Sequence, residues 1–185
     1  MNDLEIRASI PVEVREAEDG QIRVAGYAAV FDEETDIGGM FREAIAPGAF
    51  ADAVGRDDVV FLVNHDGLPL ARTRSGTLRL KEDDHGLYME ADLDPTDPDV
   101  RAIVPKMKRG DLDKMSFGFI AERQSWRDMD SKYPKRTIEQ ARLFDVSVVT
   151  TPAYEGTEIA LRSLKALRAE QSQARRRLRM KARLK

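Results

Sequence analysis

Alternating apolar and polar residues run through most of the first 150 positions and predict a mainly β protein. Residues 5–14 and 21–31 are rich in β-branched residues, and Ala17-Glu18-Asp19-Gly20 between them favours a turn, so a hairpin is predicted. A second hairpin is predicted where residues 78–81 and 87–93 flank an acidic, Gly-containing turn. Further strands are predicted at residues 57–65, 114–122 and 142–150.

Two short segments have helical rather than strand patterns. Pro47 stands where a first helical residue is favoured, and an Ala-rich stretch follows it to Val54 and ends at Gly55. Between Asp97 and Gly110, apolar residues recur at helical spacing, and the aspartates before them are suited to capping the helix. We therefore expect an α+β fold, mainly β with flanking helices, whose antiparallel sheet curls into a β-barrel-like core.

Composition narrows the class of protein. A chain of 185 residues with 42% hydrophobic residues can build the core of one domain. It has no apolar run near the roughly 20 residues that span a bilayer and no signal-peptide pattern, so we expect cytoplasmic synthesis and no membrane partner. Because the sequence contains no Cys, a hydrolase built on it must use oxygen chemistry rather than a thiolate.

Charge divides the chain into two parts. The segment from Arg162 to Lys185 holds ten Lys or Arg and one Glu, a net charge of +9, which leaves −12 on residues 1–161 because the whole chain carries −3. We expect a domain at residues 1–161 and a basic, helical or flexible tail at residues 162–185. The tail is either a solvated segment or one that folds against an acidic partner. The acidic domain would repel phosphate, so nucleic acid is expected, if anywhere, only at the tail.

Ser116 lies in Met115-Ser116-Phe117-Gly118-Phe119, where strand alternation puts Ser116 and Gly118 on one face and the three large apolar residues on the other. The absence of a side chain at Gly118 would leave room for a substrate backbone beside the hydroxyl. Ser116 is therefore either a nucleophile or a small polar residue tolerated on a strand.

His65 is one of only two histidines. Alternation along residues 59–65 would put it on the same face as Phe61 and Val63, at the end of a strand, where it is either a hydrogen-bonded structural residue or the base for a serine nucleophile. The other histidine, His85, lies in an acidic turn that favours a solvated ring.

Asp145 is the third unusual residue, a carboxylate inside the apolar run of residues 143–149. An unpaired charge in a buried strand is costly, so Asp145 needs a partner. It either pairs with a cation such as Arg142 or orients a histidine as the third member of a catalytic triad.

These segments together resemble the prohead maturation proteases of tailed bacteriophages, a serine endopeptidase family related in fold to the herpesvirus assemblins. The resemblance covers most of residues 20–160 and is carried by Gly26-Tyr27-Ala28, Phe31-Asp32, residues 43–50, Asn64-His65-Asp66, residues 115–119 and residues 143–154. It implies that His65 and Ser116 are catalytic. Assemblins use a second histidine where this chain offers Asp145, so Asp145 is the expected orienting residue and a His–Ser dyad helped by water or Asp66 is the alternative.

The resemblance also implies a function and partners. The expected substrates are the scaffolding region of the major capsid protein and the protease itself, which could also form a homo-oligomer. The expected locations are the host cytoplasm and then the interior of the prohead. Oxyanion donors are expected among the backbone N–H groups of residues 150–153. We expect no cofactor and no bound metal.

Two other classes of function compete with this interpretation. A non-enzymatic capsid assembly or scaffold protein would account for the tail and the β-rich domain without chemistry. A metal hydrolase would use His65, Asp66 and His85 as ligands.

Overall fold

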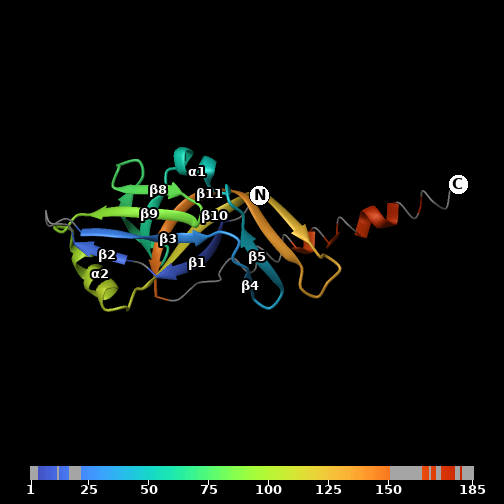
Figure 1. Ribbon diagram of the computed structural model, residues 1–185, viewed down its shortest axis with the longest axis horizontal. Coiled ribbons are helices and arrows are strands. Elements are labelled where there is room, and N and C mark those ends of the chain that lie inside the picture. The colour runs from blue at the N-terminus through green and yellow to red at the C-terminus, as the bar shows by residue number, and fades with distance from the viewer. Residues whose placement is uncertain are drawn as a thin grey trace.

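The computed structural model describes residues 4–11, 13–16, 22–150, 164–166, 168–169, 172–177 and 180. Among these residues the strands form two sheets that share one hydrophobic core (Figure 1). None of the helices in this part of the chain has the length and apolar character needed to cross a membrane.

The larger sheet has seven strands, arranged in the order β1-β10-β11-β5-β4, with β6 paired to β11 and β7 to β6. Its strands are β1 (Glu5–Pro11), β4 (Thr35–Ile37), β5 (Phe41–Ile45), β6 (Val60–Val63), β7 (Asp66–Arg72), β10 (Lys114–Arg127) and β11 (Lys135–Val149). The long strand β11 pairs in parallel with β5 through its first residues and with β6 through its last. The strands that carry Ser116 and Asp145, β10 and β11, therefore lie in the middle of the sheet.

The smaller sheet is antiparallel and has the order β2-β3-β9-β8. Its strands are β2 (Glu13–Glu16), β3 (Ile22–Val30), β8 (Leu78–Glu82) and β9 (Gly86–Leu93). Alternate residues of β9, such as Leu87, Met89 and Ala91, are buried in the shared core, as a sheet with one covered face requires.

Two helices flank the sheets. α1 (Ala51–Arg56) contacts β8 and β11, and α2 (Pro98–Lys108) contacts β2 at the other side of the molecule (Figure 1). The Asp97 side chain accepts a hydrogen bond from the backbone N–H of Asp99 at 2.8 Å, so the predicted N-cap of α2 is confirmed.

The expected mainly β fold with flanking helices is confirmed, and three details differ from the prediction. The pairs β11–β5 and β11–β6 are parallel, so the larger sheet is mixed, and the described strands form two sheets with no closed barrel. In the predicted N-terminal hairpin, only β2 pairs with β3, because β1 crosses to β10 instead. The first helix begins at Ala51, after a turn at residues 47–50, rather than at Pro47.

The hairpin of β10 and β11 extends beyond the core as an arm (Figure 1). A second, smaller apolar cluster lies along it, in which Leu164 of the basic tail is 4% exposed and packs with Ile37 and Phe41. Trp126 of β10 packs against this cluster, with its ring centroid 5.1 Å from that of Phe41. The start of the described tail is therefore fixed to the domain by an apolar contact.

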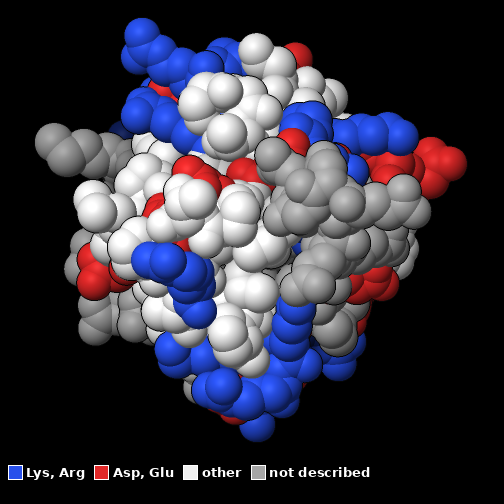
Figure 2. Space-filling view, turned by 90° about the vertical axis from the view of Figure 1, so that its left-hand side faces the viewer, with Lys and Arg blue, Asp and Glu red and all other residues white. Residues whose placement is uncertain are grey.

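Positive side chains are not confined to the tail. Figure 2 shows Lys and Arg gathered along the lower edge of the end face, around a largely uncharged middle. On α2, Arg101, Lys106 and Lys108 are exposed, as is Arg109, the residue that caps its C-terminus. The net charge of −12 on residues 1–161 is thus a sum over surfaces of both signs.

Candidate active site

The structure brings His65, Ser116 and Asp145 together on the face of the larger sheet opposite the shared core. Nε2 of His65 lies 2.6 Å from Oγ of Ser116, and Nδ1 lies 2.6 Å from Oδ1 of Asp145. Because a carboxylate oxygen only accepts, this contact puts a proton on Nδ1 and leaves Nε2 able to accept the serine proton. A hydroxyl, an imidazole and a carboxylate linked in this order can activate the hydroxyl as a nucleophile.

Ser116 lies on β10 with the alternation that the sequence predicts. Met115, Phe117 and Phe119 are in the core, and Ser116 points to the opposite face. The residue has no exposed surface, and its hydroxyl donates a 2.8 Å hydrogen bond to the carbonyl oxygen of Arg7 on the neighbouring strand β1. In this conformation the hydroxyl is therefore enclosed as well as hydrogen-bonded.

His65 does not lie on a strand, and the prediction that it shares a face with Phe61 and Val63 is wrong. Val63 pairs with Asp66, so Asn64 and His65 form the two-residue turn between β6 and β7, with φ of 51° and 59°. Positive φ at both central residues is what a tight type I′ hairpin requires, and Asn and His adopt it more readily than most residues. The turn carries the imidazole out of the strand pattern and over the face that holds Ser116.

The turn is anchored to the end of β11 by Asn64. Its backbone N–H donates to the carbonyl of Val148 at 2.9 Å, and its side-chain oxygen accepts from the N–H of Thr150 at 3.2 Å. Asn64 thus fixes the position of the turn that carries the imidazole, in addition to the hydrogen bonds that the imidazole itself makes.

Asp145 reaches the same face through an irregularity in β11. Gly118 of β10 pairs with Asp145, but the next residue, Phe119, pairs with Leu143, so Phe144 is an extra residue in the ladder. Such a β-bulge reverses the alternation and re-aims the side chains that follow it. Leu143 and Val146 therefore both face the core, whereas Asp145 faces the histidine.

Gly118 has a different role from the one predicted. A Cβ at this position would overlap Oδ2 of Asp145 and lie 3.2 Å from its Cγ. The space above Gly118 therefore holds the Asp145 carboxylate rather than a substrate backbone.

Ser147 also belongs to the site, although the sequence analysis did not identify it. Its hydroxyl donates to Oδ1 of Asp145 at 2.7 Å and lies 3.2 Å from Nδ1 of His65. The sequence did contain a signal for it. Ser147 is a polar residue two positions after Asp145 in a strand predicted to be buried, so it needs a hydrogen-bond partner just as Asp145 does.

A buried ionic network holds β1 against the strands of the site. Arg136 of β11 has no exposed surface and contacts Glu5 of β1 at 2.5 Å and Glu43 of β5 at 2.8 Å. Arg7 of β1 contacts both glutamates from the other side, at 2.8 and 2.5 Å. Burial alone would lower the pKa of Arg136, but the hydrogen bond to Glu5 and the charges of both glutamates outweigh it, so the pKa is raised.

The remaining residues considered from the sequence lie outside this hydrogen-bonded group. His85 is exposed in the turn between β8 and β9, with its ring centroid 4.4 Å from that of Tyr27, so it is on the other sheet. Asp66 is exposed at the start of β7, and Arg142 lies over the ring of Phe144 rather than beside Asp145. No three His, Asp or Glu side chains of the described residues are grouped as metal ligands.

The N–H of Thr150, one of the expected oxyanion donors, is the group that donates to Asn64. Residues 151–153 lie outside the described part of the chain, so the prediction for them stays a prediction.

Comparisons with known proteins agree with the resemblance found in the sequence. The prohead protease of Enterobacteria phage HK97 is 32% identical over 139 residues, which make up 73% of this chain and 57% of that protein. This chain therefore spans a little over half the length of that relative. The capsid assembly protease of bacteriophage T4 shares the fold, with a TM-score of 0.53 and 12% identity over 81% of this chain and 98% of the other.

The family profile of the caudovirus prohead serine proteases matches residues 10–171, nearly the whole chain and all three candidate residues. The chain belongs to this family of prohead proteases.

Proposed function

We propose that this chain is a serine endopeptidase that cleaves the scaffolding region of the major capsid protein, and itself, during prohead maturation. The observation that carries the proposal is the pair of 2.6 Å contacts that join Asp145 to Nδ1 of His65 and Nε2 of His65 to Oγ of Ser116, in a member of this family. Of the two orienting groups considered from the sequence, Asp145 is supported over Asp66, because it is the carboxylate bonded to the imidazole.

The proposed reaction is acyl transfer. Nε2 of His65 takes the proton of Ser116 as Oγ bonds to the substrate carbonyl carbon, and Asp145 stabilises the resulting imidazolium. The imidazolium then gives its proton to the leaving amine as the peptide C–N bond breaks. Water, activated by the same imidazole, attacks the acyl-enzyme and releases the second product with Ser116 restored. We expect backbone N–H groups after β11 to bind the oxyanion.

The contact between Ser116 and β1 has a consequence for this reaction. A hydroxyl has one proton, so Ser116 cannot donate to the Arg7 carbonyl and to Nε2 at the same time. Proton transfer to His65 therefore requires that the hydrogen bond to Arg7 be broken when the substrate carbonyl arrives.

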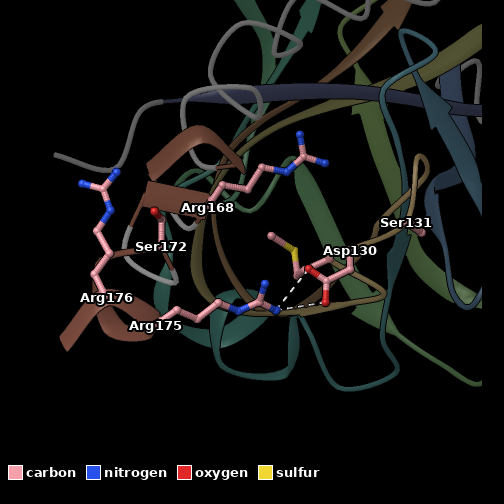
Figure 3. Close-up of a pocket in the computed structure, with 7 residues that line it drawn as sticks. Asp130, Ser131, Arg168, Ser172, Arg175 and Arg176 are labelled. Carbon is pink, nitrogen blue, oxygen red and sulfur yellow. Dashed lines mark hydrogen bonds and ion pairs between the residues drawn. The ribbon is translucent and has the colours of Figure 1, made fainter. Parts of the chain in front are cut away.

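The basic tail supplies the proposed means of association with the prohead. A hollow of about 540 Å³ lies between the described helical residues of the tail and the loop that joins β10 to β11, and Arg168, Arg175 and Arg176 line it (Figure 3). Asp130 of that loop already pairs with Arg175 at 3.1 Å, which shows that a carboxylate fits there. We propose that carboxylates of the capsid or scaffold surface bind these arginines and bring the protease into the shell.

The catalytic part of the proposal is tested by mixing the protein with a capsid protein that retains its scaffolding region and measuring intact masses. The parent and a Ser125→Ala control should cleave the capsid protein and react with a serine-directed phosphonate at Ser116, whereas Ser116→Ala should do neither. If the Ser116→Ala protein cleaves as the parent does, the serine mechanism is wrong. If neither the parent nor any variant cleaves the capsid protein and capsids still mature, the non-enzymatic assembly function is supported instead.

The association is tested by comparing two double variants that remove the same charge. Arg168→Gln with Arg175→Gln should reduce incorporation into proheads while leaving cleavage in solution unchanged. Lys165→Gln with Arg177→Gln, on the same tail but not lining the hollow, should be incorporated like the parent. Equal incorporation of both double variants would refute the role of the hollow.

A further inference from the structure

Ser147 occupies a position from which it can act on the triad without touching the substrate. It lies on β11 two residues after Asp145 and pairs directly with Ser116 of β10, so the side chains of all three residues share one face. Ser147 has no exposed surface. A hydroxyl buried in this way must donate a hydrogen bond to a neighbouring acceptor, because leaving it unpaired would cost free energy.

The hydrogen bonds of Ser147 converge on a single oxygen atom. Oδ1 of Asp145 accepts from Ser147 at 2.7 Å and from Nδ1 of His65 at 2.6 Å. Oγ of Ser147 lies 3.2 Å from the same Nδ1, so the three groups form a closed triangle. Ser147 thus lies on the Nδ1 side of the imidazole, away from the Nε2 atom that serves Ser116.

We propose that Ser147 is a positioning residue that fixes the Asp145 carboxylate, and through it the tautomer and tilt of His65. The torsion that turns a carboxylate has a broad energy minimum, so one hydrogen bond from the imidazole does not define its orientation. The Oδ2 end of the carboxylate fills the space that the missing side chain of Gly118 leaves, so no Cβ of that residue packs against it. The hydroxyl of Ser147 supplies the second constraint on Oδ1, and this inference rests on the proposed function of the triad.

The role predicts a loss of rate rather than of substrate binding. Without the hydroxyl, the carboxylate can rotate and the imidazole spends less time aligned with Ser116, so Ser147→Ala should lower kcat by about tenfold to a hundredfold, the range for losing a hydrogen bond to a charged group. KM for the capsid protein should stay within about twofold, because Ser147 contacts no substrate. Ser147→Thr keeps the hydroxyl and suits a strand, so it should recover most of the rate.

The two histidines of the chain provide a readout that a merely structural role would not move. In NMR spectra of protein labelled at histidine, Ser147→Ala should shift the Nδ1–H resonance of His65 and leave the signals of His85 unchanged, because His85 packs against Tyr27 on the other sheet. Ser125→Ala, which removes a strand hydroxyl in the arm, should change neither rate nor spectrum.

The outcomes separate this inference from the proposed function. An inactive parent would refute the proposed function, whatever the variants do. An active parent with a Ser147→Ala variant of equal kcat and an unmoved His65 resonance would overturn the positioning role alone. A rate loss accompanied by shifted His85 signals, or one that Ser147→Thr fails to restore, would show a general packing effect and would also overturn it.

Discussion

Replacement of Gly118 by alanine should disable the proposed triad of His65, Ser116 and Asp145 while leaving the fold intact. Gly118 lies directly opposite Asp145 in the ladder of β10 and β11. An added Cβ would overlap Oδ2 of Asp145, the free end of a side chain, and the nearest group outside that carboxylate, Leu4 Cδ1, would lie at an ordinary contact distance of 3.7 Å. The methyl group can therefore be accommodated only if the carboxylate moves.

The size of the effect follows from the required movement. To restore ordinary contact of about 3.5 Å between the added Cβ and Oδ2, the carboxylate must retreat by more than about 1 Å. A displacement of that size directed away from His65 would lengthen the 2.6 Å bond between Oδ1 and Nδ1 to more than about 3.5 Å, beyond hydrogen-bond range. A 1 Å misplacement in a catalytic group can cost about 10²-fold and loss of the correct tautomer in a Ser-His-Asp triad about 10⁴-fold. We expect kcat to fall between these limits, which corresponds to about 3 to 5 kcal/mol of activation free energy.

Two other glycines provide matched controls. At Gly86, an added Cβ would overlap the backbone oxygen of Ala29 and lie 3.0 Å from its carbonyl carbon, so Gly86→Ala should destabilise the smaller sheet. At Gly55, nothing lies within 4 Å, so Gly55→Ala should leave activity unchanged and stabilise α1 slightly. Cleavage of the capsid protein and thermal unfolding, measured on all three variants, should thus separate catalysis from stability.

The reasoning would be refuted by a Gly118→Ala variant that cleaves at the parent rate. In that case the Asp145 carboxylate would either move without consequence or not orient His65 at all. A variant that loses activity only in proportion to its loss of folded protein would equally contradict it, because the overlap would then be absorbed by the backbone.

Two further predictions concern stability. Arg136→Met should lower the free energy of unfolding in urea by about 3 to 5 kcal/mol, because it leaves the two buried carboxylates of Glu5 and Glu43 with Arg7 as the one remaining cation of their network; an unchanged midpoint would contradict this. A hydrogen bond from Arg79 lowers the pKa of Asp92 to about 2. This is below the value of about 3.9 for an unfolded chain, so the stabilisation is complete above about pH 4 and is lost as the pH falls through about 2. Asp92→Asn should therefore lower Tm at neutral pH and have little effect near pH 2, and an equal change at both pH values would show that the pair's charge is not the cause.

The sequence predicts the parts of the site in which strand geometry is regular. Ser116 lies in a stretch of β10 that keeps strict alternation, so its face could be derived from Met115 and Phe117. The helix α2 and the hairpin of β8 and β9 could be predicted for the same reason, since each is defined by contacts close in sequence.

Long-range pairing could not be derived in this way. Strand β1 has the composition of a hairpin partner for β3, but its pairing with β10 is fixed by the contact of Glu5 and Arg7 with Glu43 and Arg136. Glu5 and Arg7 are far in the sequence from Glu43 and from Arg136, and no local pattern shows that their charges meet. The strands β4, β5 and β7 were missed because they are short or have an irregular burial pattern.

The faces of His65 and Asp145 could not be predicted either, because strand alternation assigns a face only where the strand is regular. Strict alternation would put His65 with Phe61, and Asp145 with Leu143, on the core side of the sheet. The positive φ of His65 and the extra residue at Phe144 each reverse that assignment. A left-handed conformation at a non-glycine residue costs on the order of 1 to 3 kcal/mol, so it persists only where the surrounding structure holds it. Two independent departures from the strand pattern thus bring an imidazole and a carboxylate to one buried serine, which is the arrangement that the proposed triad requires.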